Sequence, residues 1–123
     1  SSDVCSSDLL NVFSIKCNKK LSDLFQSQKL YLDNNAITVI PDAFGNLTQL
    51  LYLYLNGNQI TIIPDAIGNL IQLQELSLSN NKITVIPDAI SNLTQLEKLD
   101  LSCNNITIIP NMIKQNTKLA IKI

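Results

Sequence analysis

Residues 53–75 read LYLNGNQITIIPDAIGNLIQLQE, and this stretch decides the fold because it recurs along the chain. Close copies begin at Leu30, Leu76 and Leu99, so successive starts lie 23 residues apart. Every copy opens with L-x-L-x-x-N, continues with I-T-x-I-P and then has a helix-like piece with apolar positions three apart. Self-similarity at a period of roughly 20 to 50 residues is typical of solenoids. The sequence therefore predicts stacked copies of one unit.

The L-x-L segment of each copy predicts a short strand with one buried face. Alternate side chains of a strand point to opposite faces, so Leu53 and Leu55 face the core while Tyr52 and Tyr54 face outward. Neighbouring copies then pair as a parallel sheet with one row of residues per repeat. Pro64 suits the start of the helical piece, which covers the inner leucines from the convex side. One unit buries too little apolar surface to offset its ordering entropy, so stacking is required.

Asparagine recurs at one position of every copy, shortly after the predicted strand. The four residues are Asn35, Asn58, Asn81 and Asn104. The backbone turns sharply there and leaves inward polar groups without partners, and a carboxamide can donate and accept hydrogen bonds at once. We predict that this Asn ladder ties each turn to the next unit and that its role is structural.

The repeats resemble the leucine-rich repeat family. The motif L-x-x-L-x-L-x-x-N-x-I fits the units that begin at Leu50, Leu73 and Leu96, whereas the first unit has Ser27 at the leading position. The second half of each unit is similar to the 23-residue class found in Ras-pathway scaffolds, plant intracellular relatives of the Ras group and bacterial proteins. The resemblance covers about residues 27–123. It implies an α/β solenoid, an arc with a parallel sheet on the concave face and short helical or turn segments on the convex face.

Composition argues against several classes of function. A net charge of −1 gives no electrostatic reason to expect nucleic acid or an anionic membrane as partner. No apolar run approaches the roughly 20 residues that span a bilayer. With no histidine, three scattered cysteines and three glycines, the chain offers no catalytic triad, metal cluster or phosphate loop. We predict no enzyme activity, cofactor, metal or small-molecule substrate.

The outward strand positions form the predicted partner-binding face. Three columns run down the concave sheet: Lys29, Tyr52, Glu75 and Lys98, then Tyr31, Tyr54, Ser77 and Asp100, then Asp33, Asn56, Ser79 and Ser102. Because neighbouring strands lie about 4.8 Å apart, Tyr31, Tyr52 and Tyr54 can form one patch. Tyrosine is favoured in binding hot spots. Cross-strand packing that shields the sheet explains the same residues equally well.

The tyrosine patch favours a protein-interaction module that holds a protein or peptide on the concave face. We expect a cytoplasmic fragment of a larger signalling, scaffold or effector protein, and a partner with an apolar knob beside a basic stretch. One alternative is the ligand-binding ectodomain of a secreted or receptor protein, in which the sequons at Asn46, Asn92 and Asn105 could carry glycans. The other alternative is the targeting arm of a larger enzyme.

A column of β-branched residues stands directly before the buried Ile-Pro pair. Its members are Val39, Ile62, Val85 and Ile108. The pattern leaves their orientation open. We favour an arrangement in which they tuck beneath the convex turns. Otherwise they form an exposed apolar stripe for a neighbouring domain or a second copy.

The start of the chain departs from the repeat. Residues 1–9, SSDVCSSDL, resemble a translated sequencing adapter, so we interpret them as a non-native tail that replaces the natural N-terminus. Residues 10–28 are interpreted as an N-terminal flank or a degenerate repeat. An alternative for this flank is a cysteine-containing cap of extracellular repeats.

The last of the repeats in residues 29–123 degrades. Asn116 and Lys122 stand where leucines recur, which predicts a cap-like or truncated unit. If one residue had been dropped, Ile121 and Ile123 would face inward instead.

Overall fold

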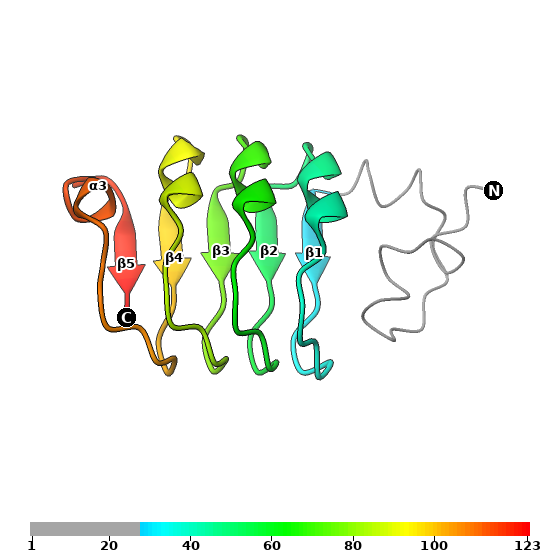
Figure 1. Cartoon of the computed structure of the whole chain (residues 1–123). Helices are drawn as coiled ribbons and strands as arrows, with labels where there is room; N and C mark the ends of the chain where they lie inside the picture. The colour runs from blue at the N-terminus through cyan, green and yellow to red at the C-terminus, as the bar shows by residue number, and fades with distance from the viewer. Residues whose placement is uncertain (1–27) are drawn as a thin grey trace.

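The computed structural model describes residues 28–123, which form a solenoid of stacked coils. Five short parallel strands make one sheet in the order of the sequence. They are β1 (Lys29–Tyr31), β2 (Tyr52–Tyr54), β3 (Glu75–Ser77), β4 (Lys98–Asp100) and β5 (Ala120–Lys122). Figure 1 shows the sheet behind the return segments, with the helical pieces at one end of the coils and tight turns at the other. The predicted α/β solenoid is confirmed.

The pairing register follows the 23-residue period. Leu53 lies opposite Leu30 on one side and Leu76 on the other, and Leu76 in turn lies opposite Leu99. All four side chains are buried, because every strand presents its central leucine to the core. Equivalent positions therefore stack directly, and outward side chains form straight columns across the sheet.

The helical pieces are short because the apolar positions that they bury lie three apart. They are the 3-10 helices η2 (Asp42–Asn46), η3 (Asp65–Asn69) and η4 (Asp88–Asn92), followed by a single α-helical turn, α3 (Asn111–Lys114). A 3-10 helix has about three residues per turn, so Ile67 and Leu70 point the same way and both are fully buried. Pro64 directly precedes η3, and Asp65 places a carboxylate at the positive helix end.

The last coil is one residue shorter than the others. Ile121 lies opposite Leu99 at a spacing of 22 residues instead of 23. The structure therefore contains the one-residue deletion that the sequence left open. The backbone N–H of Leu119 donates to the Asn116 carbonyl at 3.2 Å, as Leu96 donates to Leu93 in the preceding coil at 3.1 Å. The missing residue therefore lies between Leu119 and β5.

The core becomes thinner in this last coil. Ile121 is only partly buried and Ile123 is 47% exposed, so the expected inward pair is right for Ile121 and wrong for Ile123. Asn116 is exposed at the position where Leu93 is buried. The predictions for residues 1–9, and for residues 10–28 except the last of them, fall outside the described residues.

Candidate partner-binding face

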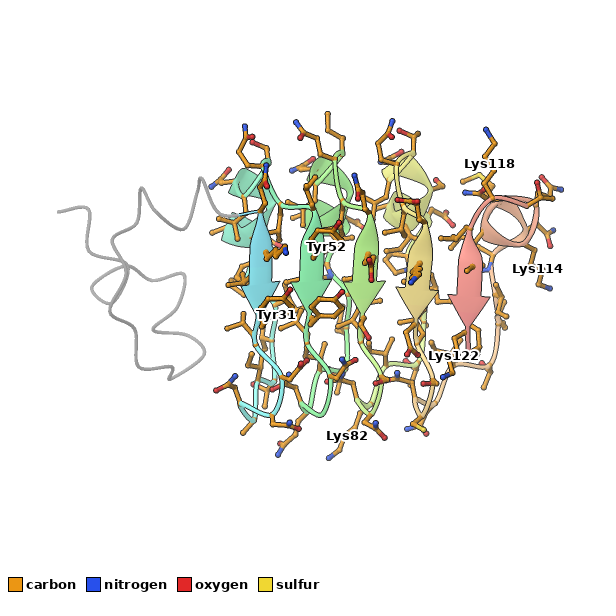
Figure 2. The ribbon with its side chains drawn as sticks, turned by 180° about the vertical axis from the view of Figure 1, so that it is seen from behind. Tyr31, Tyr52, Lys82, Lys114, Lys118 and Lys122 are labelled. Carbon is orange, nitrogen blue, oxygen red and sulfur yellow. The ribbon has the colours of Figure 1, made fainter. Side chains whose placement is uncertain are left out.

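The strand register brings the predicted binding residues onto one surface. Lys29, Tyr52, Glu75 and Lys98 lie opposite one another in successive strands, and so do Tyr31, Tyr54, Ser77 and Asp100. We call these two columns the sheet face. Figure 2 looks onto it, with Tyr31 and Tyr52 labelled on the first two strands.

Two of the three tyrosines form a stacked pair across β1 and β2. The rings of Tyr31 and Tyr54 have centroids 5.0 Å apart and planes within 4° of parallel. Tyr31 remains 60% exposed, so this pair does not bury itself. The Lys29 ammonium lies 5.5 Å from the ring centroid of Tyr52, within range of a cation–π interaction. The sheet face therefore carries one aromatic cluster at its N-terminal end.

The tyrosine hydroxyls are held by residues of the next coil. The Tyr54 hydroxyl donates to the Glu75 carboxylate at 2.9 Å, and the Tyr52 hydroxyl donates to the Gln74 side-chain oxygen at 3.3 Å. Partial burial, followed by the hydrogen bond and the negative charge of Glu75, raises the pKa of Tyr54 to about 12. These contacts fix both rings before any partner arrives, which lowers the ordering cost of binding.

The third predicted column is occupied by hydrogen bonds within the fold. Asp33 accepts from the backbone N–H of Asn56 at 2.7 Å, and Asn56 accepts from the N–H of Ser79 at 2.8 Å. The Ser102 N–H and hydroxyl both donate to the Asp100 carboxylate, at 3.0 and 2.7 Å. Short polar side chains at the end of a strand are typical of such turn contacts. This structural role is not among the roles predicted from the sequence, although the residue types signal it.

The Asn ladder joins each turn to the coil before it. The Asn58 side-chain oxygen accepts from the Ile37 N–H at 3.0 Å, while its nitrogen donates to the carbonyls of Leu32 at 3.1 Å and Leu55 at 2.9 Å. Asn81 and Asn104 repeat the arrangement one and two coils later. The expectation that the ladder would join each turn to the following unit is wrong in direction.

Asn35 differs from the other three ladder residues. Its side chain is exposed, and its nitrogen donates to the carbonyl of Asp33 in its own turn at 3.1 Å. The ladder proper therefore consists of Asn58, Asn81 and Asn104, with Asn35 contributing the backbone N–H that Asn58 binds at 2.9 Å.

The β-branched column points to solvent, contrary to the favoured expectation. Its exposed fractions are 54% for Val39, 71% for Ile62, 67% for Val85 and 76% for Ile108. The flanking isoleucines explain the orientation. Ile60 and Ile63 both turn inward, which leaves Thr61 and Ile62 outside. The alternative of an exposed apolar stripe describes the structure, and the stripe lies on the convex side.

Among residues 28–123, the structure contains no helix with the length and apolar character needed to cross a bilayer. The same part of the chain contains no group of three or more His, Cys, Asp or Glu side chains placed to hold a metal ion.

Comparison with known proteins identifies relatives of this architecture. The family model described as Leucine rich repeat matches residues 8–60, 26–83, 60–106 and 71–121. An internalin (inlF) from Listeria monocytogenes is 33% identical, with a TM-score of 0.75 over 94% of this chain. Internalin C2 from the same organism is 32% identical, with a TM-score of 0.70 over 80%. A leucine-rich repeat protein of Leptospira interrogans is 34% identical, with a TM-score of 0.71 over 78%.

These solved structures are considerably longer than the chain. It spans 34% of the inlF chain, 42% of the internalin C2 chain and 25% of the Leptospira chain. None of the curated proteins compared with the sequence matches it.

Proposed function

Because the chain belongs to the leucine-rich repeat family, we propose that it is an interaction module that holds a partner protein or peptide on its sheet face. Repeats of this family commonly serve protein interaction. The observation that carries the proposal is the partly exposed aromatic cluster of Tyr31, Tyr52 and Tyr54, in which the hydroxyls of Tyr52 and Tyr54 donate to side chains of the next coil. Aromatic side chains fixed in this way supply contact area at low entropic cost.

The charges beside the cluster are mixed in sign. Glu75 is bound to the Tyr54 hydroxyl, and Asp100 lies between Ser77 on β3 and Lys122 on β5. Lys98 adds a second positive charge on β4. We therefore expect an apolar knob of the partner, seated on the tyrosines, to supply most of the affinity. A basic stretch of the partner would add selectivity near Glu75.

The test begins with a random peptide library selected against the wild-type chain. The affinity of the selected peptides is then measured by fluorescence anisotropy on the Tyr52→Ala, Tyr54→Ala double variant. We expect a loss of at least about 30-fold, because hot-spot side chains are worth about 2 kcal/mol or more. A Thr61→Ala, Thr84→Ala variant, at exposed positions of the return segments, is the matched control, and circular dichroism should be unchanged in both. Peptides that bind both variants equally would refute the proposal.

We place this module in the cytoplasm, as part of a larger signalling, scaffold or effector protein. Cys103 supports the compartment, because its thiol is free and exposed, as is common in a reducing environment. The second candidate is a secreted or receptor ectodomain, which is favoured by the exposure of the three sequon asparagines, Asn46, Asn92 and Asn105. Expression through a secretory pathway, followed by enzymatic deglycosylation, separates the two candidates by the presence or absence of a mass shift.

A further inference from the structure

The convex side carries an apolar surface that the sheet-face proposal does not use. We call the exposed column of Val39, Ile62, Val85 and Ile108 the convex stripe. It contributes one β-branched side chain per coil, and the Val85 and Ile108 backbones lie side by side in an isolated parallel bridge. At a spacing of about 4.8 Å per coil, four such residues extend over about 15 Å. Regularly spaced apolar groups at this exposure are typical of a docking surface.

The stripe is bordered by carboxylates along one edge. Asp42, Asp65 and Asp88 follow the stripe by three residues in the first three coils, and all three are exposed. Their carboxylates make no ion pair or hydrogen bond with another described residue. The fourth coil has Asn111 at this position. These carboxylates belong to the helical pieces, whereas Lys82 lies at the opposite, turn end of its coil, as Figure 2 shows.

The apolar and acidic groups meet in one groove. Between the second and third coils lies a groove of about 410 Å³, whose lining includes Ile62, Val85 and Asp65. A side chain that enters this groove contacts the branched methyl groups, and a cation beside it would reach the carboxylate. The charge at the border therefore selects a basic partner over an acidic one.

The spacing of the stripe selects the shape of the partner. An α-helix has a pitch of about 5.4 Å, so side chains at i, i+4, i+7 and i+11 advance at nearly the same interval as the coils. An extended strand places same-face side chains about 6.6 to 6.8 Å apart and falls out of step after two coils. A helix lying across the coils can therefore seat one apolar side chain per repeat.

We propose that the convex face docks an amphipathic helix of about three turns from a partner protein, with its apolar side chains on the convex stripe and flanking Lys or Arg side chains facing Asp42, Asp65 and Asp88. This interaction is separate from the one proposed for the sheet face. The two surfaces lie on opposite sides of the sheet, so each can be tested while the other is intact.

The probe is a fluorescein-labelled peptide of about 14 residues with Leu at i, i+4, i+7 and i+11, Lys beside them and Ala elsewhere. Its binding to the full chain is followed by fluorescence anisotropy. We expect the Ile62→Thr, Val85→Thr variant to lose at least about tenfold in affinity, which corresponds to about 1.4 kcal/mol. Threonine keeps the branched shape at an exposed position, so the fold should persist by circular dichroism. The single variant Val85→Thr serves as a milder second test.

Further variants and peptides test the contribution of the aspartates and the surface on which the peptide binds. Asp65→Asn with Asp88→Asn should weaken binding and reduce its dependence on salt. Loss of peptide affinity in the Tyr52→Ala, Tyr54→Ala variant, with unchanged affinity in the Ile62→Thr, Val85→Thr variant, would place the peptide on the sheet face and overturn the proposal. A peptide of the same composition with scrambled order, and one with Glu in place of Lys, should both bind at least about tenfold more weakly.

Three results would overturn the proposal. The first is equal binding of the designed and scrambled peptides, and the second is unchanged affinity in the Ile62→Thr, Val85→Thr variant. The third comes from sedimentation of the chain alone. A dimer that dissociates in this variant would assign the stripe to a second copy rather than to a basic helix.

Discussion

One backbone position in every coil adopts a left-handed conformation that few residue types tolerate. Asn34, Gly57, Asn80 and Cys103 recur every 23 residues and have φ angles between 57° and 68°. Glycine has no Cβ to clash there, and asparagine is the commonest other residue in this region. Cysteine has neither advantage. The fourth coil therefore stores strain at Cys103 that its counterparts avoid.

Cys103→Asn should stabilise the protein by about 1 kcal/mol, because it relieves a left-handed residue that is not glycine or asparagine. Urea unfolding measures the change. Cys103→Ala is the control, since it removes the thiol but keeps the strain, and it should give no gain. Gly57→Ala should have the opposite effect, because a Cβ at that left-handed position would also clash with the Asn34 side chain. A Cys103→Asn variant no more stable than Cys103→Ala would contradict this account.

At the scale of the strands, the pairing of β2 with β3 affects the pKa of one tyrosine. Because Tyr54 on β2 is partly buried and its hydroxyl donates to the Glu75 carboxylate on β3, the pKa of the phenol is raised to about 12, compared with 10.0 for a free tyrosine. The folded state therefore holds the proton more tightly than the unfolded state. This contribution to stability is complete below pH 10 and is lost as the pH rises through 12.

Ultraviolet titration of the three tyrosines should show one phenol ionising well after the others. Glu75→Gln removes the carboxylate charge and should move the late transition towards the ordinary range. Tyr31→Phe is the matched control, because it preserves the stacked pair and should leave a late transition in place. If all three phenols of the wild-type protein titrate together, the Tyr54–Glu75 contact does not persist in solution.

The strands and turns also show what sequence can and cannot predict. The 23-residue period determines the strands, because a slip of one residue would expose Leu53 and its counterparts. The sequence leaves the exposure of the convex stripe open and favours burial, because Ile62 and Ile63 are neighbours and both apolar. Only the path between the inward-facing Ile60 and Ile63 decides which side chain is exposed. The hydrogen bonds of Asn56 also depend on the three-dimensional turn, which a column of outward residues does not reveal.

At the scale of the whole molecule, each coil is stabilised chiefly by its two neighbours. In such a solenoid, stability is approximately the sum of contributions from coils and from the interfaces between them. The backbone N–H of Leu55 donates to Ser77 at 2.8 Å, and that of Leu101 donates to Lys122 at 2.7 Å. At most 1% of either leucine side chain is exposed to solvent. The two amides therefore differ in their position along the array, not in local contacts.

Native-state hydrogen exchange should report a lower opening free energy at Leu101 than at Leu55. The reason is that Leu101 depends on β5, where Ile121 is only partly buried and Asn116 leaves the core thin. Ile121→Ala should lower protection at Leu101 further and leave Leu55 nearly unchanged, since the third and fourth coils lie between Leu55 and Ile121. Equal opening free energies at both amides, falling together in the variant, would mean that the coils unfold as a single unit. The additive description would then be wrong for this protein.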